Sequence, residues 1–109
     1  MKRGDVVLTV LPGNYGKPRP AVVVQGDAVT EADYGSVVVC PMTSATGQGL
    51  LVRVPVAPSQ GNGLKADSEI MVEKLAGVSA KRLRGVIGRL DAVTMRAVDR
   101  ALLVVLGFA

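Results

Sequence analysis

The sequence predicts a mostly β, α+β domain in which a largely antiparallel sheet is followed by one C-terminal helix. Short runs of valine and other strand-forming residues alternate with segments containing glycine, proline or asparagine, which is typical of strands joined by turns. After Asp91 the apolar residues instead recur at helical spacing. The chain has 109 residues, 49% of them hydrophobic, which predicts a single domain over residues 1–109 with one modest core.

The first half of the chain contains three valine-rich runs that predict strands, at residues 6–11, 21–25 and 36–40. Two prolines and two glycines make residues 12–18 a loop between the first two runs. The second run is apolar without alternation, so we expect it to be central in the sheet and covered on both faces. Residues 27–34 are acidic and predict a loop or a single helical turn. Pro41 is expected to stop the third strand.

The second half of the chain predicts three weaker strands, at residues 50–56, 69–75 and 83–90. Alternation around Arg53 indicates that the first of them is half-exposed, and Pro55 places it near a sheet edge or a strand end. Residues 57–67 are expected to form a long surface loop. Gly85 and Gly88 weaken the last strand.

The C-terminal segment predicts a helix that is capped by Asp91 and ends near Gly107. Its main apolar face carries Met95, Val98, Leu102 and Val105. Further apolar residues widen this stripe beyond one packing face: Leu103, Val104 and Leu106. The excess either contacts a second subunit or simply covers more of the sheet.

The composition excludes several classes of site. Without histidine, the chain lacks the usual acid, base and metal ligand near neutral pH. Its one cysteine can form neither an internal disulfide nor a cysteine-rich zinc site, so we expect no metal and no cofactor. The aromatic residues (3%) are too few for a base-stacking surface. Any catalysis must use carboxylates, arginine, lysine, hydroxyls or the backbone.

The net charge of +4 is unevenly distributed. Residues 1–20 carry a net +3, residues 21–73 a net −4 and residues 74–109 a net +5. The basic ends either face a nucleic acid or an acidic protein, or are simply solvated. The N-terminus has no signal-peptide apolar region, and the longest apolar run, at residues 101–106, is too short to cross a bilayer. We expect a cytoplasmic protein with no membrane association.

Three positions are candidates for chemistry. Arg19 lies between Pro18 and Pro20, which stiffen the backbone beneath a guanidinium suited to phosphate, although it also fits an ordinary surface arginine. Thr43 follows the third strand in a hydroxyl-rich segment that can bind phosphate or simply form a turn. Glu73 ends the fifth predicted strand and is either a general base or an exposed charge paired with a basic residue.

The order of short motifs resembles the MazF/PemK family of toxins from bacterial toxin–antitoxin systems. Arg3-Gly4-Asp5 opens the first strand, Arg19-Pro20 opens the second, and Pro41-Met42-Thr43-Ser44 follows the third. Glu73-Lys74 and a C-terminal helix complete the order, so the resemblance spans nearly the whole chain. The loop before Arg19 is shorter than in many members, and Lys74 stands where many have glutamine.

This resemblance implies a small SH3-like antiparallel β-barrel with a C-terminal helix. It implies a homodimer that cleaves single-stranded RNA at preferred sequences without a metal and is inhibited by a cognate acidic antitoxin. By position, Arg19 and Thr43 match the family's catalytic residues, and Glu73 matches a carboxylate with an acid/base role in some members. We expect Lys17 and Ser44, which flank the first two, to bind the RNA.

Two alternatives use the same fold. One is a gyrase poison like the related CcdB toxins, which act through C-terminal helix residues that include a tryptophan near the chain end. This chain has no tryptophan. The other is a small barrel that binds RNA without cutting it. Such a barrel retains the basic residues but does not depend on Thr43.

Overall fold

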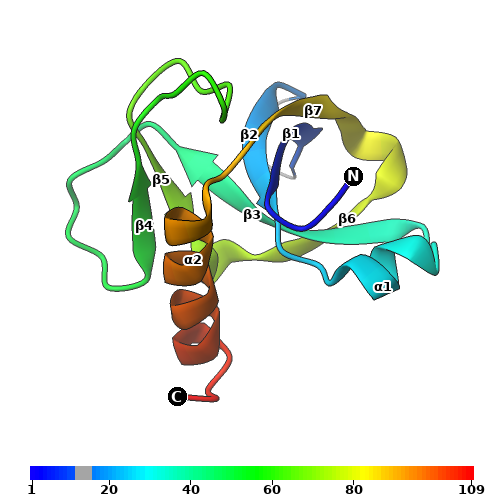
Figure 1. The fold of residues 1–109 in the computed structure, drawn as a ribbon. Helices are drawn as coiled ribbons and strands as arrows, with labels where there is room; N and C mark the ends of the chain where they lie inside the picture. The colour runs from blue at the N-terminus through cyan, green and yellow to red at the C-terminus, as the bar shows by residue number, and fades with distance from the viewer. Residues whose placement is uncertain (12–15) are drawn as a thin grey trace.

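The computed structural model describes residues 1–11 and 16–109 (Figure 1). Within these ranges seven strands form one sheet in which every pairing is antiparallel. The strands are β1 (Asp5–Val10), β2 (Pro18–Val23), β3 (Ser36–Thr43), β4 (Arg53–Val56), β5 (Ser68–Met71), β6 (Ala76–Ser79) and β7 (Leu83–Arg89). Their order is β4-β5-β3-β2-β1-β7, with β6 paired to β3.

The sheet curls into a barrel-like ring that does not close. Figure 1 shows β1, β2, β3, β6 and β7 around this ring, with β4 and β5 to one side. The ends of the hydrogen-bonded path in the described residues are β4 and β7. The predicted mostly β fold with a C-terminal helix is confirmed. Pro55 lies in β4 at one end of this path, which confirms its predicted edge position.

β2 is the central strand that its apolar sequence predicts. Ala21, Val22 and Val23 are fully buried between β1 and β3. Val22 packs in one core, which lies under the C-terminal helix, and its two neighbours pack in a second core on the other face. β2 begins three residues earlier than predicted, at Pro18. This is possible because residues 18–20 pair with β1 alone, so the prolines interrupt no ladder with β3.

β3 continues through Pro41 to Thr43, so the expectation that Pro41 ends the strand was wrong. One flank of β3 pairs with β6 over residues 36–39 and with β5 at Met42 and Thr43. Pro41 lies where this flank changes partner and is unpaired there. A missing backbone N–H is tolerated at such a position.

The predicted strand over residues 69–75 is correct only for its first three residues, which lie in β5. The chain then leaves the strand in a 3-10 turn, η1 (Val72–Lys74), and β6 begins after residue 75, a break that the sequence pattern did not reveal. Val72 is fully buried in this turn, so its burial reflects packing rather than strand alternation. β4 likewise begins only at Arg53, after a turn at residues 51–52. Glu73 therefore projects from a turn and not from a strand end.

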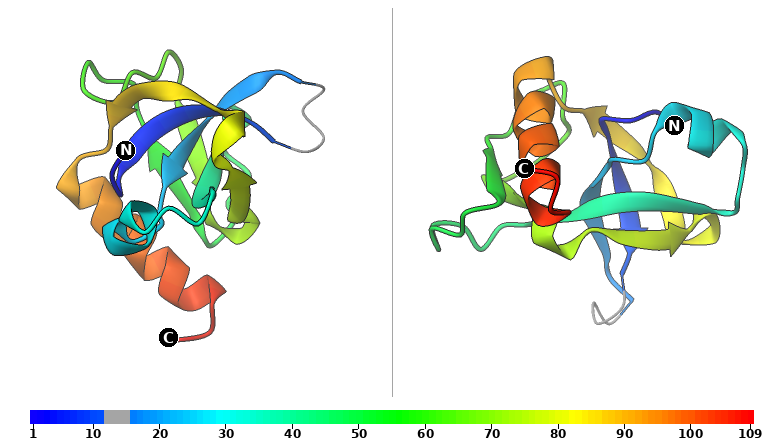
Figure 2. Two further views of the ribbon diagram at one scale, coloured as in Figure 1. Left: turned by 90° about the vertical axis from the view of Figure 1, so that its right-hand side faces the viewer. Right: turned by 90° about the horizontal axis from the view of Figure 1, so that it is seen from below.

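The predicted C-terminal helix is α2 (Ala92–Val105), which packs against β4 and η1 (Figures 1 and 2). The Asp91 side chain accepts a hydrogen bond from the Thr94 amide, and Gly107 follows the helix with φ +81°. Both predicted ends are confirmed. Residues 27–34 contain the short helix α1 (Asp27–Glu31), which is the predicted helical turn. Within the described ranges no helix is long and apolar enough to span a membrane.

Candidate active site

Four of the five predicted site residues line one cavity of about 550 Å³. Arg19 and Lys17 reach it from the start of β2, and Thr43 and Ser44 from the end of β3. The register explains this, because Ala21 pairs with Pro41. Arg19 and Thr43 are each two residues beyond this pair, so their side chains leave the same face of the sheet. The predicted loop at residues 12–18 lies mostly outside the described residues; Lys17 is exposed and Pro18 belongs to β2.

A second cavity of about 290 Å³ adjoins the first. Arg19, Met42 and Thr43 line both cavities, so these residues form the boundary between them. Lys74 also lines the second cavity, at the position where many members of the resembled family have glutamine. A chain-like polyanion that crosses this boundary could place one anionic group beside Arg19 and Thr43. Lys17 and Lys74 would then lie on opposite sides of that group.

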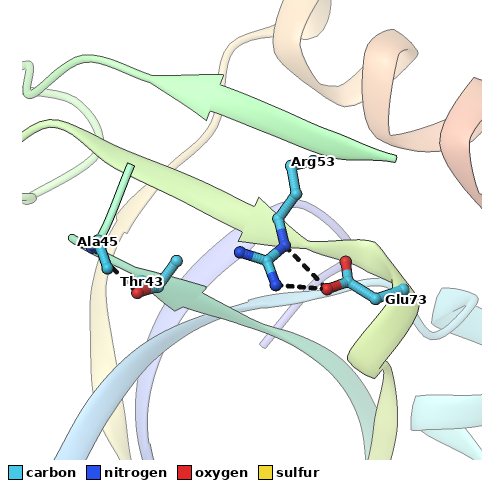
Figure 3. A network of polar contacts seen from close by, with 4 residues as sticks. All are labelled: Thr43, Ala45, Arg53 and Glu73. Carbon is cyan, nitrogen blue, oxygen red and sulfur yellow. Dashed lines mark hydrogen bonds and ion pairs between the residues drawn. The ribbon is translucent and has the colours of Figure 1, made fainter. Parts of the chain in front are cut away.

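Thr43 has the dual use that its sequence context indicates. Its Oγ1 accepts a hydrogen bond from the Ala45 amide at 3.1 Å, which is the predicted turn interaction (Figure 3). A hydroxyl has two lone pairs and one hydrogen, so this bond leaves the hydrogen available to donate to a ligand. The turn therefore orients the hydroxyl without using its donor.

Arg19 is exposed, and its side chain donates no hydrogen bond to another described residue. Its guanidinium has a fork of charged donors that matches two oxygens of a phosphate. Its position between two prolines in a paired strand holds its backbone in place. These features suit recognition of an anion.

Glu73 lines neither cavity and is paired instead with Arg53 (Figure 3). Its Oε2 accepts hydrogen bonds from Arg53 Nε at 2.8 Å and from Nη2 at 2.6 Å. The hydrogen bonds from Arg53 hold the pKa of the Glu73 carboxyl below its ordinary value, and Lys74 adds to this effect. A carboxylate stabilised in this way is a weaker base. The ion pair joins residues 20 apart in the sequence, and no local pattern indicated it.

Cys40 is the lone thiol, and it is fully buried in β3. Burial raises the pKa of its thiol to about 12, so it is uncharged at neutral pH and is not a nucleophile. Outside residues 12–15, no three Asp, Glu, Cys or His side chains lie close enough together to hold a metal ion. The charged side chains of the described residues that line the two cavities are Lys17, Arg19, Lys65 and Lys74.

One wall of the larger cavity was not predictable from the sequence pattern. Gly63, Leu64, Lys65 and Ala66, in the connection from β4 to β5, line it together with the predicted residues. The pattern indicated only a surface loop, because nothing local shows that this loop folds back toward β2. The Gly61-Asn62-Gly63 sequence was the available signal, and it predicts a tight turn without predicting where the turn lies.

Comparison with known proteins identifies the fold and the family. Two curated relatives are mycobacterial. The "Probable endoribonuclease MazF" of Mycolicibacterium smegmatis is 37% identical over 110 residues, covering 100% of this chain and 99% of that protein. Endoribonuclease MazF9 of Mycobacterium tuberculosis is 29% identical, covering 94% and 92%.

Solved structures have the same fold. Mycobacterium tuberculosis toxin MazF-mt6 superimposes with a TM-score of 0.79 at 24% identity, over 94% of this chain and 96% of that chain. A mycobacterial endoribonuclease in complex with its cognate antitoxin superimposes with a TM-score of 0.82 at 21% identity, over 100% and 97%.

The family model described as PemK-like, MazF-like toxin of type II toxin–antitoxin system matches residues 2–106. That range contains both cavities and every predicted site residue. The resemblance drawn from the order of the motifs is therefore confirmed, and the chain belongs to the PemK/MazF family of toxins of type II toxin–antitoxin systems.

Proposed function

We propose that this protein is a toxin that cleaves single-stranded RNA as a metal-independent, sequence-specific endoribonuclease and so inhibits translation and growth. The observation that carries the proposal is the convergence of Arg19 and Thr43 at the boundary of two cavities. Its full-length relatives are named endoribonucleases, which supports the same reaction type. Because the proposed substrate is cellular RNA, we place the protein in the cytoplasm.

In the proposed reaction the ribose 2′-hydroxyl gives up its proton to water and attacks the adjacent phosphorus, and the bond from phosphorus to the 5′-oxygen breaks. The products are a 2′,3′-cyclic phosphate, or its hydrolysed form, and a 5′-hydroxyl. Arg19 stabilises the negative charge that develops on the non-bridging oxygens, gives a proton to the leaving 5′-oxygen as that bond breaks, and regains a proton from water. Thr43 donates its hydroxyl hydrogen to a phosphate oxygen. Lys17 and Ser44 bind the adjoining backbone.

Glu73 has a different role in this proposal from the one expected from the sequence. Its carboxylate is occupied by Arg53 and lies outside both cavities, so it acts as a positioning residue rather than as the base. The pair fixes η1, the turn that presents Lys74 to the smaller cavity.

We further propose a homodimer inhibited by an acidic antitoxin. Leu103, Val104, Leu106 and Phe108 are exposed apolar residues at the end of α2, and they suit burial against a second copy. The basic Lys17, Arg19 and Lys74 suit an acidic segment that competes with RNA. A relative of the same fold was solved with its cognate antitoxin, which supports this partner class.

The test is cleavage of a long single-stranded RNA in EDTA with the ends mapped. We expect wild type to cut at defined sites, leaving 5′-hydroxyl ends. Arg19→Ala and Thr43→Ala should each cut at least about a hundredfold more slowly, because each loses a donor to the developing charge. Lys81→Ala, a basic change outside both cavities, is the matched control.

Equal cleavage by wild type and Arg19→Ala would contradict the proposal. Intact RNA with trapped, cleaved DNA in a gyrase assay would favour the gyrase poison instead. Binding of RNA without cutting, unaffected by Thr43→Ala, would favour the RNA-binding barrel.

A further inference from the structure

The connection between β4 and β5, residues 57–67, is a preformed wall of the larger cavity. Four consecutive residues of it, Gly63 to Ala66, line the cavity together with Arg19 and Thr43. Two sets of contacts hold this connection in place. One set lies within the loop itself, and the other ties the loop to β7.

Within the loop, Asn62 is buried, only 5% exposed, and its side chain makes three hydrogen bonds. Its Oδ1 accepts from the amides of Ser59 and Leu64, both at 3.0 Å, and its Nδ2 donates to the Ala57 carbonyl at 2.9 Å. Ser59 Oγ accepts in return from the Asn62 amide at 3.1 Å. These bonds hold the loop in a single turn just before Leu64 and Lys65.

Against β7, the Arg89 amide donates to the Gly61 carbonyl at 2.8 Å. Gly63 has φ +70°, and a Cβ there would overlap the carbonyl of Ile87. A Cβ on Gly88 would overlap the backbone of Asn62. The two glycines thus allow direct backbone contact between loop and strand. The loop cannot move away from β7 without losing these contacts, so the position of Lys65 is set by the fold.

This wall combines one charge with apolar surface. Lys65 is exposed and forms no ion pair with the described residues. Beside it, Leu64 lines the cavity together with Leu8 and Ile87. A volume of about 550 Å³ falls in the range of sites that hold a small organic ligand and exceeds what one phosphate group needs.

We propose that this wall is the subsite for the nucleotide next to the scissile phosphate. Lys65 binds that nucleotide's neighbouring phosphate, and the half-buried Leu8 and Ile87 give the apolar surface that packs on its base. A lysine neutralises a backbone phosphate as a point charge, whereas apolar side chains contact the face of a base. The proposal rests on the proposed endoribonuclease activity and adds a binding residue, Lys65, to it.

The first experiment measures cleavage of a short RNA that spans a site mapped for the wild-type protein. Lys65→Gln should raise KM about three- to tenfold and leave kcat within about twofold, because it removes one phosphate contact remote from the bond that breaks. The dependence of log Kd on log salt should become shallower by about 0.7. Lys65→Arg should retain wild-type values, and Lys81→Gln is the control for lost charge.

The second experiment identifies the phosphate. Binding is measured with an uncleavable all-deoxy oligonucleotide in which one linkage at a time is a neutral methylphosphonate. For the wild-type protein, a methylphosphonate at the linkage next to the scissile one should weaken binding. For Lys65→Gln, the same replacement should cause no further loss of affinity. A profile for Lys65→Gln identical to the wild-type profile would overturn the proposal. So would a Lys65→Gln protein that cuts and binds like Lys81→Gln.

The role of the close contact between the loop and β7 is tested with Gly63→Ala, which should raise KM like the lysine variant and speed hydrogen exchange of residues 59–66. Ser59→Ala, which removes a single bond to Asn62, is the milder second variant. Wild-type KM in both would contradict the positioning. Failure of wild type to cut RNA would instead refute the proposed function. If the wild-type protein cuts RNA, Arg19→Ala does not, and Lys65→Gln cuts like wild type, then the Lys65 subsite is refuted while the proposed function stands.

Discussion

Glu73 shows how one contact changes the chemistry of a residue. In the sequence it is a carboxylate beside a lysine, and both a base and a solvated charge fit that context. In the folded protein two donors of Arg53 occupy one of its oxygens. The Arg53 side chain is 9% exposed and the Glu73 side chain 31%, so the pair is only partly removed from water. The pair is therefore a structural feature of η1 and β4.

The pH dependence of stability tests this ion pair. The pKa of Glu73 is lowered on folding, so its contribution is present above the ordinary glutamate pKa. The contribution is lost as the pH falls through the lowered value. Glu73→Gln should therefore destabilise the protein by about 1 kcal/mol at pH 7. Urea titrations at neutral and strongly acidic pH should show this difference shrinking in acid.

Glu31→Gln, on the exposed helix α1, is the control, because Glu31 forms no ion pair within the described parts of the chain. It should change the urea midpoint little at either pH. A Glu73→Gln protein with the same midpoint as Glu31→Gln at pH 7 would show that the ion pair contributes no net stability.

Among the elements, α2 has one face packed in the core and another apolar face exposed to solvent. Val98 is its fully buried residue and packs in the core shared with β4, β5 and η1. Met95, Leu102 and Val105 pack around that core half-buried. The remaining apolar residues near the end of the helix are exposed in a single chain, including Leu103 and Val104 at 47% each. One helix thus contributes both to a core and to an apolar surface.

Val98→Ala should lower the free energy of unfolding by about 2 kcal/mol, because it removes two buried carbons and leaves a cavity. Val93→Ala is a matched control on the same helix, since Val93 is 68% exposed. Its effect should stay within about 0.5 kcal/mol. Urea unfolding of both variants measures the difference, and equal losses would mean that α2 does not dock as described.

For the whole molecule, the exposed end of α2 predicts the assembly. Val104→Asp places a charge on the proposed dimer surface and should convert a dimer to a monomer at micromolar concentration, because a buried unpaired charge is costly. Light scattering measures the mass. Val29→Asp, on α1, is matched in residue type and in exposure, at 46% against 47%, and should leave the mass unchanged. A wild-type monomer would contradict the homodimer.

Much of the architecture was predictable because it depends on local patterns. The unbroken apolar run of β2 requires cover on both faces, and the structure provides two cores. Asp91 marks the start of α2, because the first amides of a helix need a side-chain hydrogen-bond acceptor. Gly107 marks its end, because glycine readily adopts the left-handed backbone conformation that often follows a helix. The strand through Pro41 and the turn at Glu73 were missed, because each depends on which strand lies alongside.

The sequence by itself determined the mostly β fold, the C-terminal helix and, through the order of Arg19, Thr43 and their neighbouring motifs, the family. Those features depend on the local pattern of residue types and on the order of short motifs along the chain. Only the tertiary structure decided that Glu73 pairs with Arg53, that Lys74 faces a second cavity, and that Lys65 lies on a wall locked by Asn62. These are contacts between segments distant in sequence, and their partners are chosen by how the sheet curls and packs.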